Sequence, residues 1–359
     1  MIADWLHKKT RTQTAIHTES AALVQRRQGL RSAMGITAAV QMGAQMLLWV
    51  IYYGYDALHQ TVWLAALTQL LPLAGLWLLW RKARPAQETP AGRLVGLPLC
   101  LCVMADGALL LCALSGYVRS LIPEYPCWVS IAAPAALCLL SVWLSGENGA
   151  VYGCRLLALW LMPLFLLSTL GLGRAVQTAR LQPVWGPGFS TLSLGALGGW
   201  GCVWGVGAMH PPIQAPPRRR ELLWPLAPFL ALMLLALWYG MVRPWAAGDG
   251  LSAGAKLLAL GRHAQSMAVY ELSALFWMML LPQACVGCLR FGQGLMQRAL
   301  PGWPKALWPL VLLAPGIIGQ SLMGDGLVDF LGPVLPFRSA ISLGCGALLC
   351  ILQRKGKPS

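Results

Sequence analysis

The sequence predicts an all-α integral membrane protein with ten transmembrane helices. Ten apolar stretches run along its 359 residues, and most approach the length of about 20 residues that crosses a hydrocarbon core of about 30 Å. Apolar residues are continuous within each stretch, which favours helices, and lipid admits only helices or closed barrels. The stretches cover residues 30–50, 61–80, 94–117, 127–144, 151–172, 190–209, 222–242, 267–289, 306–323 and 331–351.

The basic residues predict the orientation of this bundle. If the N-terminal tail and every second gap lie on one side, that side holds twenty of the 27 lysines and arginines. Because cytoplasmic loops carry such an excess, we expect both termini in the cytoplasm. The expected units are a cytoplasmic tail (1–29), a ten-helix transmembrane domain (30–352) and a second cytoplasmic tail (353–359). The seven outer basic residues are Arg119, Arg174, Arg180, Arg243, Lys256, Arg262 and Arg338.

Composition restricts the possible functions. The chain is 57% hydrophobic and 11% charged, and its net charge of +15 lies mainly in short loops. Such charge indicates contact with anionic membrane lipids, and nucleic-acid binding is not expected. The one C-x-x-C pair, Cys285 and Cys288, lies in an apolar stretch without the further ligands of a metal site. The sequence contains no Ser/His/Asp set or phosphate-binding loop, so we expect neither an enzyme nor a bound cofactor or metal.

Glycines weaken two stretches that occupy corresponding positions in the two five-helix halves. The first stretch has Gly43 at mid-membrane, and the sixth has six glycines between positions 195 and 207. Each glycine costs a helix about 1 kcal/mol relative to alanine. Interrupted helices in corresponding positions are typical of a transporter binding site, so we expect breaks near Gly43 and residues 198–201, with ligand between them. Close packing through small residues is the alternative explanation.

Each broken helix would offer specific contacts to a ligand. The N-terminus of a half-helix carries partial positive charge and can hold a carboxylate. Amide groups and aromatic rings nearby would add polar and cation–π contacts. The expected ligand-binding residues are Gln41, Gly43, Ala44 and Gln45 in the first stretch, and Gly198, Gly199, Trp200, Gly201 and Trp204 in the sixth.

Charged residues inside apolar stretches are further candidates. An ionisable group in hydrocarbon is costly, so it normally faces the bundle interior and marks function. Asp106 lies in the middle of stretch 94–117 and is expected to face the central cavity and bind ligand. Glu271 lies about a turn into stretch 267–289, where it either binds ligand or is solvated at the outer surface. We interpret Arg338 as extending toward the outer surface from stretch 331–351.

Several short motifs along the chain resemble those of a known family. With ten helices expected in 359 residues, the chain resembles the spore germination permeases, which are the B subunits of germinant receptors. These belong to the amino acid–polyamine–organocation transporter superfamily. The motifs are Arg27-Gln28 before Gly43, Gln60-Thr61-Val62-Trp63, Gly146-Glu147 with Arg155 and Pro163, and Leu181-Gln182-Pro183-Val184 through Gly186 and Gly188 to Leu194-Gly195-Ala196-Leu197.

The resemblance implies a LeuT-like five-plus-five inverted repeat with discontinuous first and sixth helices. It also implies a subunit of the spore inner membrane that senses a small nutrient such as an amino acid, with transport of that nutrient as an open alternative. Its implied partners are an A-type membrane subunit and a C-type lipoprotein subunit. Thr61 and Val206 stand where the family usually has acidic residues. A stand-alone amino-acid or organic-cation transporter, and an assembly subunit with a degenerate site, therefore stay open.

The predicted topology can be tested by cysteine labelling. A cysteine replacing Gln182 on a cysteine-free background is expected to react with a membrane-impermeant maleimide added from outside. The distribution of lysine and arginine places the gap that contains Gln182 on the outer side of the membrane. Reaction from the cytoplasmic side alone would contradict the ten-helix arrangement.

Overall fold

The structure is a computed structural model, and the part it describes is helical. The described residues are 40, 43, 44, 48, 67, 90–171, 176–181, 226–242, 267–324, 326–331 and 334–355. Within them no strand occurs. The elements are α5 (Pro90–Leu121), α6 (Cys127–Leu144), α7 (Gly146–Gly171), η4 (Thr178–Leu181), α10 (Leu226–Val242), α12 (Met267–Ala299), η7 (Lys305–Leu307), α13 (Trp308–Met323), α14 (Gly326–Leu331) and α15 (Val334–Lys355).

Seven of the ten apolar stretches fall on described helices, namely α5, α6, α7, α10, α12, α13 and α15. The first, second and sixth stretches lie largely or wholly outside the described residues, so the count of ten stays a prediction. By length and hydropathy, three described segments are each able to cross a membrane: Val95–Leu121, Tyr270–Gln297 and Lys305–Met323. The prediction of long apolar helices is confirmed for these segments.

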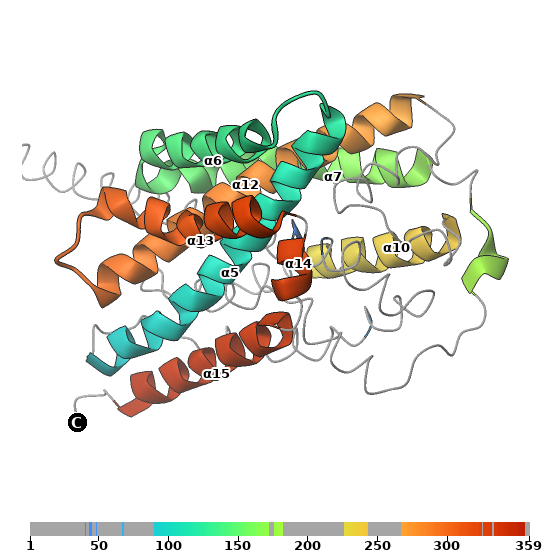
Figure 1. Cartoon of the computed structure of the whole chain (residues 1–359). Helices are drawn as coiled ribbons and strands as arrows, with labels where there is room; N and C mark the ends of the chain where they lie inside the picture. Colours follow the sequence, from blue (N-terminus) through green and yellow to red (C-terminus); the bar gives the residue numbers. More distant parts are fainter. Residues whose placement is uncertain are drawn as a thin grey trace, which may run out of the picture.

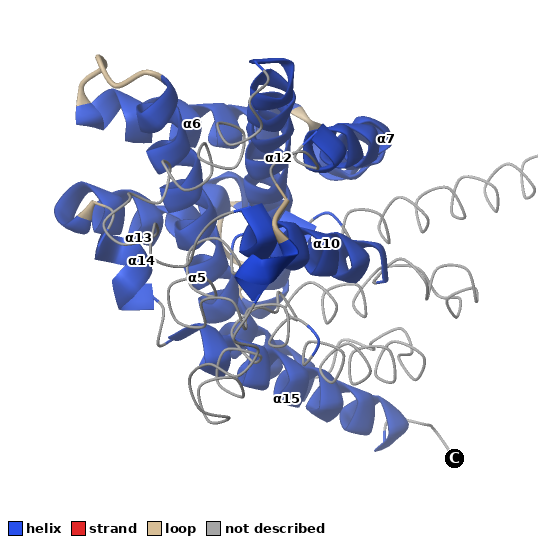
Figure 2. Cartoon of the chain, turned by 90° about the vertical axis from the view of Figure 1, so that its right-hand side faces the viewer, coloured by secondary structure: helices blue, strands red, loops and turns tan. Residues whose placement is uncertain are grey.

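Helix α5 lies at the centre of the described part. It crosses the bundle diagonally, with α12 and α13 on one side and α15 on the other (Figure 1). The view turned by 90° again places α15 along one edge, beside α5 (Figure 2). The main core cluster joins α5 to α6, α7, α10 and α12 through residues such as Leu99, Cys138, Phe165, Phe229 and Leu281. Contacts made by α5 therefore position most of the other described helices.

Small residues allow α13 to approach α5 closely. A Cβ atom added to Gly316 of α13 would lie 2.9 Å from the Cα of Ala108 in α5. Gly107 also faces this interface, since an added Cβ would lie 3.9 Å from the carbonyl oxygen of Leu312. Helices in membranes pack through such small residues because lipid tails provide no hydrophobic force between them.

A polar network around Arg290 joins α12 to the C-terminal end of α6 and to η7. Arg290 donates hydrogen bonds to the carbonyl oxygen of Val142 and, at 3.3 Å, to the hydroxyl of Ser145, at the C-terminal end of α6. It also contacts Gln293 at 3.0 Å, and Gln293 donates to the carbonyl oxygen of Lys305 at 2.7 Å. The expected loop after residue 289 is therefore helical as far as Ala299. Arg290, in this polar continuation of α12, satisfies an end carbonyl of α6, that of Val142.

The expected helix 331–351 differs from the observed arrangement. The short α14 precedes α15, which begins at Val334 and continues to Lys355. The sequence between them is Gly332-Pro333, and proline disfavours helical geometry in the residue before it. Leu327 and Leu331 of α14 are buried in a second cluster with residues of α5. Thus α14 packs on the protein instead of forming an open loop.

The contact between α5 and α13 predicts a matched pair of glycine effects. Gly316→Ala is expected to lower the thermal unfolding temperature of the purified protein, because overpacking of this kind costs about 1–3 kcal/mol. Gly294→Ala in α12 is the control: an added Cβ there meets nothing within 4 Å, and alanine favours the helix. Equal unfolding temperatures for the two variants would contradict the close approach.

Candidate functional site

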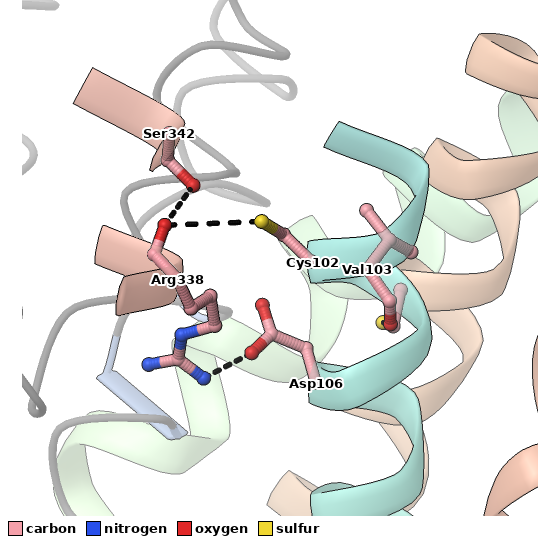
Figure 3. Close-up of polar contacts among 6 residues, drawn as sticks. Cys102, Val103, Asp106, Arg338 and Ser342 are labelled. Atoms are coloured by element: carbon pink, nitrogen blue, oxygen red, sulfur yellow. Dashed lines mark hydrogen bonds and ion pairs between the residues drawn. The ribbon is translucent and has the colours of Figure 1, made fainter. Parts of the chain in front are cut away.

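An ion pair between α5 and α15 is the central polar feature of the described membrane helices. The Nη1 atom of Arg338 donates to the Oδ1 atom of Asp106, and the two side chains point toward each other across the space between the helices (Figure 3). Asp106 is 0% exposed and Arg338 is 2% exposed. Each charge is therefore removed from solvent and compensated by the other.

Residue spacing on both helices places this pair. Asp106 is four residues after Cys102 on α5, and Ser342 is four residues after Arg338 on α15, so each couple lies on one helix face. The Arg338 carbonyl oxygen accepts a hydrogen bond from the Ser342 hydroxyl at 2.8 Å. The Cys102 thiol lies 3.8 Å from the same oxygen and is a weak donor (Figure 3). Two turns of α5 thus face two turns of α15.

The neighbouring residues of α5 face other helices. The Cys288 thiol of α12 donates to the carbonyl oxygen of Val103 at 3.4 Å. A Cβ added to Gly107 would lie 3.7 Å from the same sulfur. Asp106 is consequently held on a helix whose other faces are packed against α12 and α13. The carboxylate has a fixed direction, toward α15.

The carboxylate of Asp106 is only partly satisfied by the described residues. Its Oδ1 atom is bound by Arg338, whereas its Oδ2 atom has no hydrogen-bond partner among them. A buried ion pair adds little net stability, but loss of one partner typically costs about 3–5 kcal/mol because the other charge is left uncompensated. The pair therefore constrains the charge of anything that binds beside it.

The structure changes the interpretation of Arg338. Its expected extension toward the outer surface is wrong, because the side chain is buried and binds Asp106. Asp106 is buried as well, and without the guanidinium it would be an uncompensated charge. The sequence could have suggested this pairing, because Asp106 and Arg338 carry opposite charges and each lies inside an apolar stretch.

The other expected binding residues are only partly described. Gly43 and Ala44 are helical and buried, and Ala44 belongs to the core cluster that contains Leu99 and Val103 of α5. The remaining residues of the expected breaks lie outside the described residues: Gln41, Gln45, Gly198, Gly199, Trp200, Gly201 and Trp204. The structure therefore brings part of the first stretch to α5 and leaves the breaks as predictions.

Glu271 lies apart from the Asp106 site. It is exposed near the N-terminal end of α12. Cys288, which packs beside Gly107 of α5, lies about 25 Å farther along the same helix at a rise of about 1.5 Å per residue. The structure thus does not bring Glu271 to Asp106. Among the described residues, no group of three or more His, Cys, Asp and Glu is arranged to hold a metal ion.

Solved structures of membrane transporters are similar to this chain. A variant of the manganese transporter of Eremococcus coleocola is 14% identical, with a TM-score of 0.51 over 90% of this chain and 77% of that one. A Na⁺-coupled sialic acid symporter, in a substrate-bound outward-open state, is also 14% identical, with a TM-score of 0.59 over 89% of this chain and 79% of that one. No family model matches the sequence, and no curated protein matches it either.

At this level of identity the likeness shows the fold. The fold is that of LeuT-like membrane transporters, over nearly the whole chain. The apolar helices agree with it, and these structural neighbours are transporters and not enzymes. The chain is therefore an integral membrane protein with a LeuT-like transporter fold.

Proposed function

We propose that the chain is the permease-type subunit of a spore germinant receptor and senses a small nutrient such as an amino acid. The transporter fold carries this proposal, because such folds bind ligand near the bilayer midplane between discontinuous helices. The motif from Leu181 to Leu197 supports the choice of family, since it resembles the entry into the sixth helix of the germination permeases.

In this proposal the ligand lies between the first and sixth helices. Gln41, Gly43, Ala44 and Gln45 contact it from one side. The residues that contact it from the other side are Gly198, Gly199, Trp200, Gly201 and Trp204. The burial of Ala44 in the cluster of α5 supports a site within reach of that helix.

The setting of the subunit is also part of the proposal. It lies in the inner membrane of the spore with both termini in the cytoplasm, as the partition of basic residues predicts. It acts with an A-type membrane subunit and a C-type lipoprotein subunit.

A stand-alone transporter of amino acids or organic cations is the second candidate. The likeness to two solute transporters favours it, since both cover most of this chain. The two functions differ in what the isolated chain can do. A transporter moves solute by itself, whereas a receptor subunit needs its partners to respond.

Genetics and reconstitution separate the two candidates. Spores lacking this chain are expected to lose germination in response to at least one of the twenty protein amino acids. The tagged chain is expected to purify together with the A-type and C-type subunits. Normal germination of the deletion strain, together with amino-acid uptake by vesicles containing only the purified chain, would refute the receptor proposal and favour a transporter.

Bulky residues at the expected breaks test the position of the ligand. Gly43→Leu and Gly199→Leu are expected to abolish the germination response while the protein still reaches the membrane, because the added side chains occupy the ligand space. Gly344→Leu is the control, since it is exposed on α15 and an added Cβ meets nothing within 4 Å. Degradation of the Gly43 and Gly199 variants, with a stable Gly344 variant, would instead indicate helix packing at these glycines.

A further inference from the structure

The pair formed by Asp106 and Arg338 has zero net charge and two separated charges among the residues that the structure describes. The carboxylate comes from α5 and the guanidinium from α15, and both are buried. In the membrane interior the charge of a bound group is best compensated locally, because hydrocarbon does not solvate charge. The charges on a ligand beside this pair are thus restricted by the pair itself.

A ligand with a single charge suits this site poorly. A cation beside the pair would leave the site with a net charge of +1, and an anion would leave it with −1. An uncompensated buried charge is strongly unfavourable. A ligand with one positive and one negative group preserves neutrality and can satisfy both partners together.

The geometry of the two side chains suits such a ligand. The Oδ2 atom of Asp106 has no hydrogen-bond partner among the described residues, so it can accept from an ammonium group while Oδ1 stays with Arg338. A guanidinium carries five N–H donors in a planar fork and can bind two carboxylates at once. Ligand and pair would then form a closed ring of four alternating charges.

We propose that Asp106 and Arg338 together recognise the charged groups of the ligand and select a zwitterion such as an α-amino acid. Asp106 binds the ammonium group, and Arg338 binds the carboxylate. This inference rests on the proposed function, because it adds two residues of α5 and α15 to the contacts of the proposed nutrient and gives that nutrient a charge pattern. It places simple cations and simple anions outside the ligand class.

The first test compares charge-matched ligands on the intact purified protein. Each of the twenty protein amino acids is screened by thermal shift, and affinities are then measured for those that bind. For each one, the amine lacking its carboxylate and the acid lacking its ammonium group are measured as well. Both analogues are expected to bind at least about 100-fold more weakly than the amino acid.

Single charge removals give the sharper test. Asp106→Asn leaves a net positive site, so this variant is expected to prefer the acid analogue to the amine. Arg338→Gln leaves a net negative site, and it is expected to show the opposite preference. Matched controls are Glu124→Gln and Arg119→Gln, which remove the same charges from exposed residues and should keep the wild-type order of affinities.

The double variant Asp106→Asn/Arg338→Gln keeps the inference testable if the single variants misfold. It has no uncompensated charge and is expected to fold, since removal of both partners of a buried pair is far less harmful than removal of one. Its preference for the amino acid over the two analogues should fall to within a few-fold.

The outcomes separate this inference from the proposed function. If amino acids bind but the variants keep the wild-type order of affinities, the roles of Asp106 and Arg338 are refuted and the proposed function stands. Equal binding of amino acid, amine and acid to the wild-type protein also refutes the inference alone. If no amino acid binds the wild-type protein, both the inference and the proposed function fail.

Discussion

The need to compensate charge within the membrane governs the arrangement around α5. Asp106 is fully buried in the middle of that helix, and Arg338 approaches it from α15. Neither residue is stable in this position without the other, because each would be a bare charge in a medium of low polarity. The position of α15 against α5 follows from this requirement, and the Ser342 and Cys102 contacts reinforce it.

The other faces of α5 are occupied by packing of a different kind. Ala108 allows α13 to approach through Gly316, and Val103 receives the thiol of Cys288 from α12. These contacts use small or weakly polar groups and need close fit rather than charge. Helix α5 thus combines a packed side, which joins it to the core, with a polar side, which faces α15.

Some of this arrangement could be predicted from sequence, and some could not. Continuous apolar stretches predicted the helices, since the rule depends only on length and hydropathy. Asp106 stood out because a carboxylate in hydrocarbon demands a partner. The partner itself, Arg338, was misassigned, because hydropathy says nothing about which helices are neighbours. For the same reason the extension of α12 by Arg290 was missed, since it depends on a contact with α6.

The long separation of Asp106 from Arg338 has a consequence for biosynthesis. The two residues are 232 positions apart, and at about 5–20 residues per second the ribosome needs about 10–50 s to pass from one to the other. During that interval α5 is made while its acidic residue still lacks its partner. Its insertion must therefore be driven by the rest of its strongly apolar sequence. The arginine-bearing α15 is made later and meets a carboxylate already in the bilayer, so the charge of Asp106 is neutralised only when α15 inserts.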